Sequence, residues 1–381
     1  MRDVMVSLGR RGIDCAALVH KHVLSFTTDK ETYEASGQQF QVVRTGMWAR
    51  FLYTPISPAF PHHLRRLIKS FKPDILHLHL PNPSVFWVLG LPSARRIPWV
   101  VHWHADVITS AQDWKMKLFY RLYKPFERAV LKRATTIIAT SPPYLDSSQP
   151  LEKWRSKCRV IPLGLDATRF GGARNRRSND TKLHVLAVGR LTYYKGFSFL
   201  IKAVAKTPGI HVNLVGHGDQ AEQLKALTAS LNLQDRVSFH GILSDTELAQ
   251  QMLDCDCLCL PSIERTEAFG MVLLEAMYFG KATVISDVQG SGMGWVVDDG
   301  ITGIKVKPAD ADALAGALKR LAEDRQELAD MGRRGKEKFD RQFEINHAIA
   351  DLEKIYHRAA REQMDPGSGP GRQNGKQSSR S

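Results

Sequence analysis

The sequence has no run of about 18 apolar residues, the minimum for a helix that crosses a bilayer. This length limit excludes a protein built from membrane-spanning helices. The first residues also lack the pattern of a signal peptide, because Arg2 and Asp3 precede only a short mixed segment. We therefore expect a cytoplasmic location. At 381 residues, two domains are more probable than one, since a single core stops growing below this length.

Cysteine is scarce, and five residues in the whole chain do not indicate a disulfide framework. Cys255, Cys257 and Cys259 alternate, which predicts that all three lie on one face of a strand. A metal site needs ligands that converge from separate turns, so we predict buried, reduced thiols instead. Asp254 and Asp256 have the spacing of a metal motif, but they precede the same buried strand and are discounted.

Negative charge is in deficit, and the net charge of +14 raises the question of a nucleic-acid partner. The basic residues do not form a nucleic-acid signature, and we expect no such partner. A basic helix that carries aromatics suits an anionic membrane surface. The alternative is an amphipathic helix that buries its aromatics on a sheet while its lysines stay solvated. The cations concerned are Lys115, Lys117, Arg121, Lys124, Arg128, Lys132 and Arg133, interleaved with Trp114, Phe119, Tyr120, Tyr123 and Phe126.

Short β-branched runs alternate with helical patterns along the chain, which is typical of parallel βαβ units. Strands are predicted at 13–19, 75–79, 99–102, 136–139, 183–188, 211–215, 236–240, 257–260, 283–286 and 304–306. Helices are predicted at 311–323, 326–338 and 346–362. The predicted domains are 1–165 and 166–342, with a linker at 166–182. A last helix at 343–364 and a disordered tail at 365–381 follow.

The most informative stretch runs from Thr266 to Met277 and places Glu267 and Glu275 around a turn-to-helix junction. Gly270 allows a ligand to approach the backbone, and the helix after it has free N–H groups that suit a phosphate. A carboxylate accepts hydrogen bonds, which suits a sugar or ribose diol. The alternative is a surface acid and a helix glutamate paired with a lysine.

Glycines and cations follow two of the predicted strands. Gly189, Arg190 and Lys195 come directly after the strand at 183–188, and Gly216 and Gly218 come after the next one. A parallel sheet binds ligands at its carboxyl edge. Arginine offers a planar fork for a pyrophosphate, and lysine offers a mobile point charge.

Together these residues resemble the family-4 retaining glycosyltransferases of GT-B fold. The resemblance extends over roughly residues 1–360. The motif sequences are most similar to those of bacterial mannosyl- and rhamnosyltransferases of surface-polysaccharide assembly. It implies an α/β protein with two Rossmann-like, doubly wound domains that face a cleft, and a C-terminal helix that crosses back to the N-terminal domain. The motifs are Gly189-Arg190 with Lys195-Gly196, Gly216-His217-Gly218, Phe239-His240-Gly241, Leu260-Pro261-Ser262, Glu267/Glu275, Gly300-Ile301-Thr302-Gly303, Asp74-Ile75-Leu76-His77-Leu78-His79, Trp103-His104-Ala105-Asp106, Ala139-Thr140-Ser141 and Ile161-Pro162-Leu163-Gly164-Leu165-Asp166.

The resemblance implies retaining transfer of a hexose, of mannose type, from a GDP- or UDP-sugar to a glycan or lipid-linked acceptor, with no metal required. It assigns the pyrophosphate to Arg190 and Lys195, the ribose to Glu275, and hydroxyls of the donor sugar to Glu267. His104 would lie near the transferred sugar, and its alternative is a core or capping histidine. The remaining donor-binding positions are Gly189, Gly216, Gly218, Phe269, Gly270, Met271 and Val272. His102 is expected to be structural, and both roles stay open for His77 and His79.

The start of the chain departs from the family pattern. Members begin with a strand and a glycine-rich loop, whereas residues 1–12 resemble the end of the first helix and residues 12–15 the entry to the second strand. We therefore expect one strand and the loop to be missing, through a late start codon or a true truncation. Two alternative functions stay open: a nucleotide-sugar epimerase, which shares the GT-B architecture, and a non-catalytic nucleotide-sugar binder, which the missing segment would produce.

Overall fold

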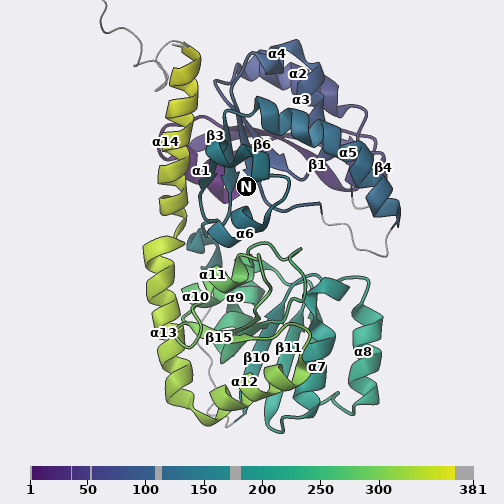
Figure 1. Cartoon of the computed structure of the whole chain (residues 1–381), viewed down its shortest axis with the longest axis vertical. Helices are drawn as coiled ribbons and strands as arrows, with labels where there is room; N and C mark the ends of the chain where they lie inside the picture. The colour runs from purple at the N-terminus through teal and green to yellow at the C-terminus, as the bar shows by residue number, and fades with distance from the viewer. Residues whose placement is uncertain (1, 36, 52–53, 108–113, 172–181, 365–381) are drawn as a thin grey trace, which may run out of the picture. The chain divides into compact units, whose positions relative to one another are not determined.

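The computed structural model describes residues 2–35, 37–51, 54–107, 114–171 and 182–364 (Figure 1). Its contacts divide the chain into two compact units. The first unit comprises 1–138, 153–159 and 350–381, and the second comprises 139–152 and 160–349. Residues 172–181 of the linker predicted at 166–182, and the tail predicted at 365–381, lie outside the described residues.

The second unit contains a six-stranded sheet in the order β12-β11-β10-β13-β14-β15. Every neighbouring pair is parallel. This order reverses between β10 and β13, so ligands are expected at the carboxyl ends of these two strands. The strands are β10 (Leu183–Val188), β11 (Ile210–Val215), β12 (Val237–Gly241), β13 (Cys257–Leu260), β14 (Ala282–Ser286) and β15 (Gly303–Val306).

Helices cover both faces of this sheet, each over its own hydrophobic cluster. One cluster unites the strands with apolar residues of α7, α8 and α12, and the other with those of α9, α10 and α11. Polar residues begin several of these helices: Ser244 and Glu247 form a capping box on α9, and Asp310 caps α12. The helices are α6 (Pro142–Ser147), α7 (Phe197–Ala205), α8 (Ala221–Ser230), α9 (Asp245–Asp254), α10 (Met271–Tyr278), α11 (Met293–Val296), α12 (Ala311–Glu323) and α13 (Arg325–Gln342).

The strands of the first unit form a three-stranded sheet, a short hairpin and a four-stranded sheet. The three-stranded sheet has the order β1-β3-β2, with β1 parallel and β2 antiparallel to β3. The four-stranded sheet has the order β6-β7-β8-β9. The strands are β1 (Ala16–Leu24), β2 (Asp29–Ala35), β3 (Gln38–Met47), the hairpin β4 (Ala49–Phe51) and β5 (Thr54–Ile56), then β6 (Leu76–Leu80), β7 (Trp99–Trp103), β8 (Thr136–Ala139) and β9 (Cys158–Val160).

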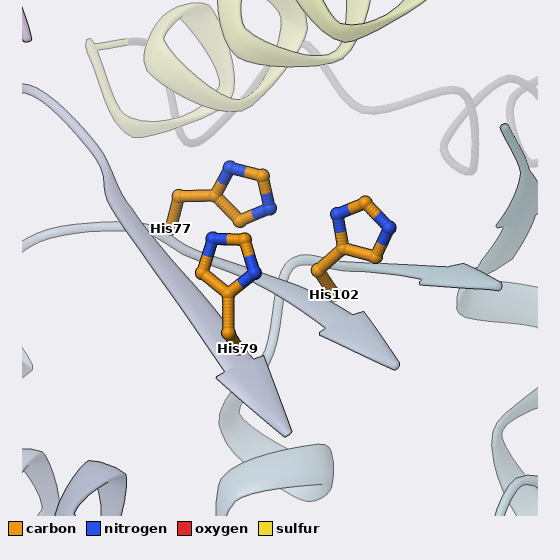
Figure 2. A group of neighbouring side chains, drawn as sticks. All are labelled: His77, His79 and His102. Atoms are coloured by element: carbon orange, nitrogen blue, oxygen red, sulfur yellow. The ribbon is translucent and has the colours of Figure 1, made fainter. Parts of the chain in front are cut away.

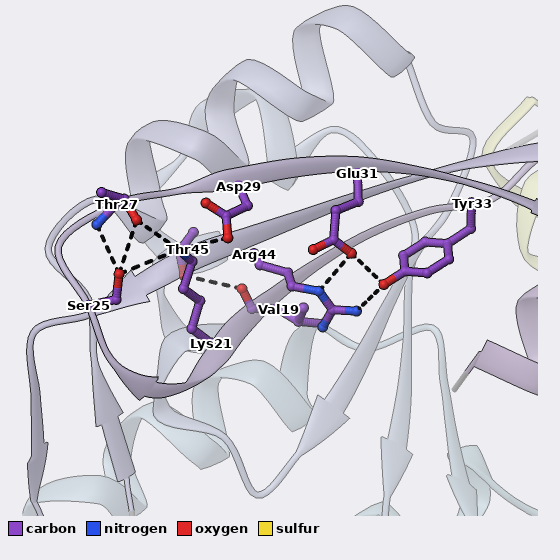
Figure 3. Close-up of polar contacts among 9 residues, drawn as sticks. All are labelled: Val19, Lys21, Ser25, Thr27, Asp29, Glu31, Tyr33, Arg44 and Thr45. Atoms are coloured by element: carbon purple, nitrogen blue, oxygen red, sulfur yellow. Dashed lines mark hydrogen bonds and ion pairs between the residues drawn. The ribbon is translucent and has the colours of Figure 1, made fainter.

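A polar network fastens β2 to β3 on the half-exposed side of their ladder (Figure 3). The Arg44 guanidinium donates from Nε to Glu31 at 3.0 Å and from Nη2 to the Tyr33 hydroxyl at 2.7 Å. At the start of the hairpin, Lys21 pairs with Asp29 at 2.7 Å. These cross-strand contacts, rather than an apolar face, hold the outer strand of the sheet.

Two long helices complete the first unit. The first, α5 (Trp114–Arg133), carries the basic and aromatic residues, and the second, α14 (Ile345–Met364), contributes its residues from 350 onward. Its Glu353 pairs with Arg11 at 2.9 Å, and the Gln363 amide donates to the Arg96 carbonyl. The shorter helices of this unit are α1 (Arg2–Gly9), α2 (Phe60–Phe71), α3 (Trp87–Gly90) and α4 (Pro92–Arg95).

All ten predicted strands are present, although the first was predicted at 13–19 and is found three residues later, as β1. The strands β2, β3, β4, β5 and β9 were not predicted. The prediction that three cysteines share one strand face is wrong for Cys255. It ends α9 before the strand begins and packs in the cluster opposite that of Cys257 and Cys259. All three thiols are buried and free, as predicted.

The predicted domain boundary at 165/166 stays a prediction. The contacts place 139–152 and 160–165 with the second unit, and the predicted linker begins with a short 3₁₀ helix, Ala167–Phe170. Ser141 accounts for part of this placement. A side chain at Gly292 would meet its hydroxyl at 2.8 Å, so the start of α6 packs on the loop before α11.

Candidate functional site

The loops after β10 and β11 pack backbone against backbone at the carboxyl edge of the second unit's sheet. A Cβ atom at Gly216 would lie 1.9 Å from the Gly189 carbonyl oxygen, and one at Gly218 would lie 2.2 Å from that of Leu191. Gly189 in turn donates its N–H to the Val215 carbonyl at 2.9 Å. Only glycine fits at 216 and 218. At these positions the two loops therefore expose backbone without side chains, beside the point where the strand order of the sheet reverses.

Lys195, from the loop after β10, contacts Glu267, from the loop after β13. The Lys195 Nζ lies 2.5 Å from the Glu267 Oε2, and the two side chains are only 11% and 13% exposed. The Ser262 hydroxyl donates to the same carboxylate oxygen at 3.3 Å. Ile263 donates its N–H to the Tyr194 carbonyl at 2.8 Å, which joins the two loops. The structure thus brings together a lysine and a glutamate that are 72 positions apart in the sequence.

Arg190 is the second residue after β10 and is exposed, so its side chain has access to solvent at the same edge of the sheet. Gly270 begins α10 with a φ of +80°, a left-handed conformation that favours glycine. Met271 and Val272 open the helix and are half-buried. Their N–H groups belong to the first turn, which an α-helix leaves without intrahelical partners.

Phe269, whose donor-binding role stays a prediction, has a buried side chain. It is 3% exposed and packs edge-to-face on Phe343, with ring centroids 6.3 Å apart. Nearby, the Ser291 hydroxyl donates to the Glu267 carbonyl at 2.5 Å, and Gly292 donates to the Ala268 carbonyl at 2.8 Å. These contacts fix the loop that carries Glu267, and the packing of the Phe269 ring helps to hold that loop in place.

Glu275 lies within α10 and has its own cationic partner. Arg169 Nη2 lies 2.5 Å from the Glu275 Oε1, and the Glu275 residue is 8% exposed. Burial raises the pKa of the Glu275 carboxyl, and the charge of Arg169 opposes that rise. The alternative pairing with a lysine is therefore wrong, because the partner is an arginine. Sequence reasoning missed Arg169, which is 106 positions away and stands in no motif.

His104 belongs to the first unit and follows β7 at its carboxyl end. Its N–H donates to the Leu80 carbonyl at 2.9 Å, and its Nε2 lies 2.8 Å from Nδ1 of His79. Burial lowers the pKa of His104 to about 4, so the imidazole is neutral at physiological pH. The preceding Trp103 is fully buried and donates its indole N–H to Asp106 at 2.8 Å, which fixes the loop after the strand.

A buried carboxyl on α5 was also missed by the sequence analysis. Glu127 is 1% exposed, and the Tyr120 hydroxyl donates to it at 3.2 Å. Burial raises the pKa of Glu127 to about 7, and the charge of Asp106 adds to this effect. A glutamate within a run of lysines and arginines gives no sequence signal for burial.

Solved structures show which fold this arrangement belongs to. A sucrose-phosphate synthase from Thermosynechococcus elongatus is 24% identical, with a TM-score of 0.75, and the match covers 94% of this chain and 92% of that one. HepE of Anabaena, solved in complex with UDP, is 18% identical with a TM-score of 0.67, and the match covers 91% and 100% of the two chains. The protein therefore has the GT-B fold, an α/β architecture with Rossmann-like units.

Two sequence families divide the chain between them. The model for "Glycosyl transferase 4-like domain" matches residues 1–164, and that for "Glycosyl transferases group 1" matches residues 173–338. The chain belongs to the group 1 glycosyltransferases and is an enzyme of that family, as its motifs predicted.

An O-antigen chain mannosyltransferase C of Escherichia coli is 28% identical over 88% of each chain. A D-rhamnosyltransferase WbpZ of Pseudomonas aeruginosa is 29% identical over 88% of this chain and 85% of its own. The epimerase alternative is not favoured by these relatives.

Proposed function

We propose that this glycosyltransferase transfers a mannose-type hexose from a GDP- or UDP-sugar to a glycan or lipid-linked acceptor, with retention of anomeric configuration. The relatives named above, a mannosyltransferase of O-antigen chains and a rhamnosyltransferase, support the sugar class and the polysaccharide acceptor. The observation that carries the proposal is the Lys195–Glu267 pair at the switch point of the second unit's sheet.

The pyrophosphate of the donor binds, in this proposal, between Arg190, Lys195 and the first turn of α10. Lys195 is already held by Glu267 at 2.5 Å, so its ammonium needs little reorganisation when the leaving group develops charge. Arg190 adds a second cation from the end of β10. Two positive side chains and a helix N-terminus supply the charge stabilisation that a divalent ion provides in other transferases, and we propose a metal-independent transfer.

The remaining donor contacts are assigned by chemistry. Glu267 accepts hydrogen bonds from hydroxyls of the transferred sugar, and Glu275 accepts those of the ribose. The ion pair with Arg169 favours the charged form of Glu275 in its buried position, and that form accepts hydrogen bonds from a diol. His104 is neutral and offers the sugar a hydrogen bond rather than a charge.

We further propose that the enzyme attaches to an anionic membrane surface through α5, where a lipid-linked acceptor resides. Leu118, Leu122 and Phe126 recur every four residues and are 53%, 67% and 52% exposed. Such a row is apolar surface that the first unit leaves uncovered, and Lys117 and Arg121 stand beside it. Tyr123, in contrast, is buried, so the helix both packs inward and presents an outward apolar row.

The surface proposal concerns attachment and not insertion. Among the described residues, no helix is long and apolar enough to cross a membrane. The side chains of Trp114 and Lys115, which were predicted to take part, lie outside the described residues.

A donor screen tests the transfer. Purified enzyme is incubated with GDP- and UDP-hexoses and a lipid-linked acceptor, products are identified by mass spectrometry, and the new linkage is assigned by NMR. We expect one α-linked hexose from an α-configured donor. Arg190→Ala should lower kcat by roughly 10²–10³, the usual cost of one transition-state charge contact.

Lys206→Ala is the matched control for Arg190→Ala. It removes an exposed cation of the same unit, paired with Asp312 on the surface, and should leave kcat unchanged. An Arg190→Ala enzyme that transfers sugar at the parent rate, or a product with inverted configuration, would contradict the proposal.

A further inference from the structure

Four histidines of the first unit gather on one face of the β6-β7 ladder. His77 and His79 alternate along β6, and the parallel register places His102 of β7 opposite His79. His104 follows two residues later. Neighbouring rings stack with centroids between 4.4 Å, for His102 and His104, and 5.5 Å, for His79 and His102. Figure 2 shows the first three converging from the two strands.

This cluster contains buried nitrogen atoms without hydrogen bonds. Among the described residues, Nε2 of His77 and both ring nitrogens of His102 have no partner. A buried polar atom without a partner is destabilising, and native proteins rarely leave several together. In a neutral imidazole one nitrogen carries the proton and the other a lone pair, so each of these two rings can offer a lone pair to a ligand.

One nitrogen of His77 and one of His79 have hydrogen-bond partners. His77 Nδ1 lies 2.5 Å from the Tyr356 hydroxyl of α14, and His79 Nδ1 lies 2.8 Å from Nε2 of His104. When each Nδ1–H donates in these contacts, Nε2 of both rings presents a lone pair. Metal-binding histidines are oriented by this same kind of hydrogen bond from the nitrogen that does not bind the metal.

The kind of ligand follows from the chemistry of the side chain. A neutral imidazole offers a nitrogen lone pair, and it is the form of histidine that binds zinc.

We propose that His77, His79 and His102 form a binding site for a late first-row divalent metal ion, with Zn²⁺ as the preferred occupant. One nitrogen from each ring lies within 4.8 Å of the others. Zinc bonds of about 2.0–2.1 Å require about 3.4 Å between tetrahedral ligands, so the rings close on the ion by rotation about their side-chain torsions. A water molecule completes the coordination.

The ion has a structural and positioning role. All three ligands belong to the first unit. Because a ring nitrogen of His79 contacts Nε2 of His104 at 2.8 Å, an ion that fixes the His79 ring also fixes the orientation of His104 at the end of β7.

Metal titration of the full chain tests this site without depending on transferase activity. Metal-free protein is titrated with Co²⁺, whose visible spectrum distinguishes tetrahedral nitrogen ligation from octahedral hydration, and Zn²⁺ is then added in competition. We expect one ion per chain and a higher melting temperature with Zn²⁺ but not with Mg²⁺. His102→Ala should abolish the tetrahedral spectrum.

Two further variants make the result decisive. Tyr356→Phe keeps the aromatic ring and removes only the hydroxyl that orients His77, and it should weaken Co²⁺ binding roughly 10- to 100-fold. His62→Ala with His63→Ala removes a neighbouring pair on α2, with ring centroids 5.4 Å apart, and should change nothing. An octahedral spectrum only, binding lost with the α2 pair, or unchanged affinity in Tyr356→Phe would each overturn the proposal.

Discussion

The Lys195–Glu267 pair makes a prediction that separates stability from catalysis. Lys195→Met removes the ammonium and leaves the Glu267 carboxylate with the hydrogen bond from the Ser262 hydroxyl. Removal of one partner from a fully buried pair costs about 3–5 kcal/mol. Because these side chains are 11% and 13% exposed, we expect Lys195→Met to lower the free energy of unfolding by about 2–3 kcal/mol. A loss of this size lowers the melting temperature by about 5–10 °C for a unit of this length.

The double variant Lys195→Met, Glu267→Leu should regain most of that stability. Both charges are then gone, and apolar side chains of similar volume replace a buried pair at little or no cost. Activity should not return, because the pyrophosphate has lost a cation and the donor sugar has lost an acceptor. We expect kcat of the double variant to stay about 10²–10³ below that of the parent enzyme.

The assay combines thermal unfolding of the ligand-free enzyme with initial rates at saturating donor, for both single variants, the double variant and the parent. Lys206→Ala serves as the surface control, since its pair with Asp312 is 50% and 79% exposed and should contribute less than about 1 kcal/mol. The reasoning fails if Lys195→Met melts like the parent. It fails equally if the double variant transfers sugar at the parent rate.

Three further outcomes are expected. Since the pKa of Glu127 is about 7, its contribution to stability is full below about pH 4.5 and is lost as the pH rises through 7. Glu127→Gln should therefore raise the unfolding free energy by up to about 3 kcal/mol near pH 8 and by little near pH 4. An equal effect at both pH values would contradict this prediction. Glu275→Gln should weaken nucleotide binding, measured by calorimetry, more than it lowers kcat at saturating donor, because ribose contacts are similar in ground and transition states. Leu122→Glu should reduce cosedimentation with anionic vesicles while Ile242→Glu, an exposed site of the second unit, does not; equal binding by both variants would refute attachment through α5.

The second unit could be predicted from its sequence strand by strand because of where its strands lie. Each strand is a short apolar run in a parallel sheet covered on both faces, and such runs stand out between helical patterns. The hairpin β2-β3 of the first unit was not predicted, for the opposite reason. Its outer strand, Asp29–Ala35, is exposed or half-exposed along its length and is held by Arg44 and Glu31 rather than by an apolar face.

Some residues of the candidate site could likewise be predicted from the sequence, and others could not. Gly189, Lys195 and Glu267 lie in the loops after β10 and β13, at the carboxyl edge of the sheet, and their motifs could be recognised from the sequence. Arg169 and Glu127 are recognisable only from their partners. Arg169 meets Glu275 across 106 positions, and the burial of Glu127 depends on the helix face that packs inward. No local pattern encodes a contact of this kind.

The two glutamates of the motif have separate cations, and this separation bears on mechanism. Glu267 and Lys195 meet at the edge of the sheet, where an incoming pyrophosphate can share the ammonium while the carboxylate turns to sugar hydroxyls. Glu275 and Arg169 pair within α10's buried side, where Phe170 stacks beneath the guanidinium at 4.5 Å. We expect the second pair to persist when donor binds and the first to be redistributed. Contacts that change between the free and reacting states are those that accelerate a reaction, which assigns rate to the Lys195 pair and affinity to the Glu275 pair.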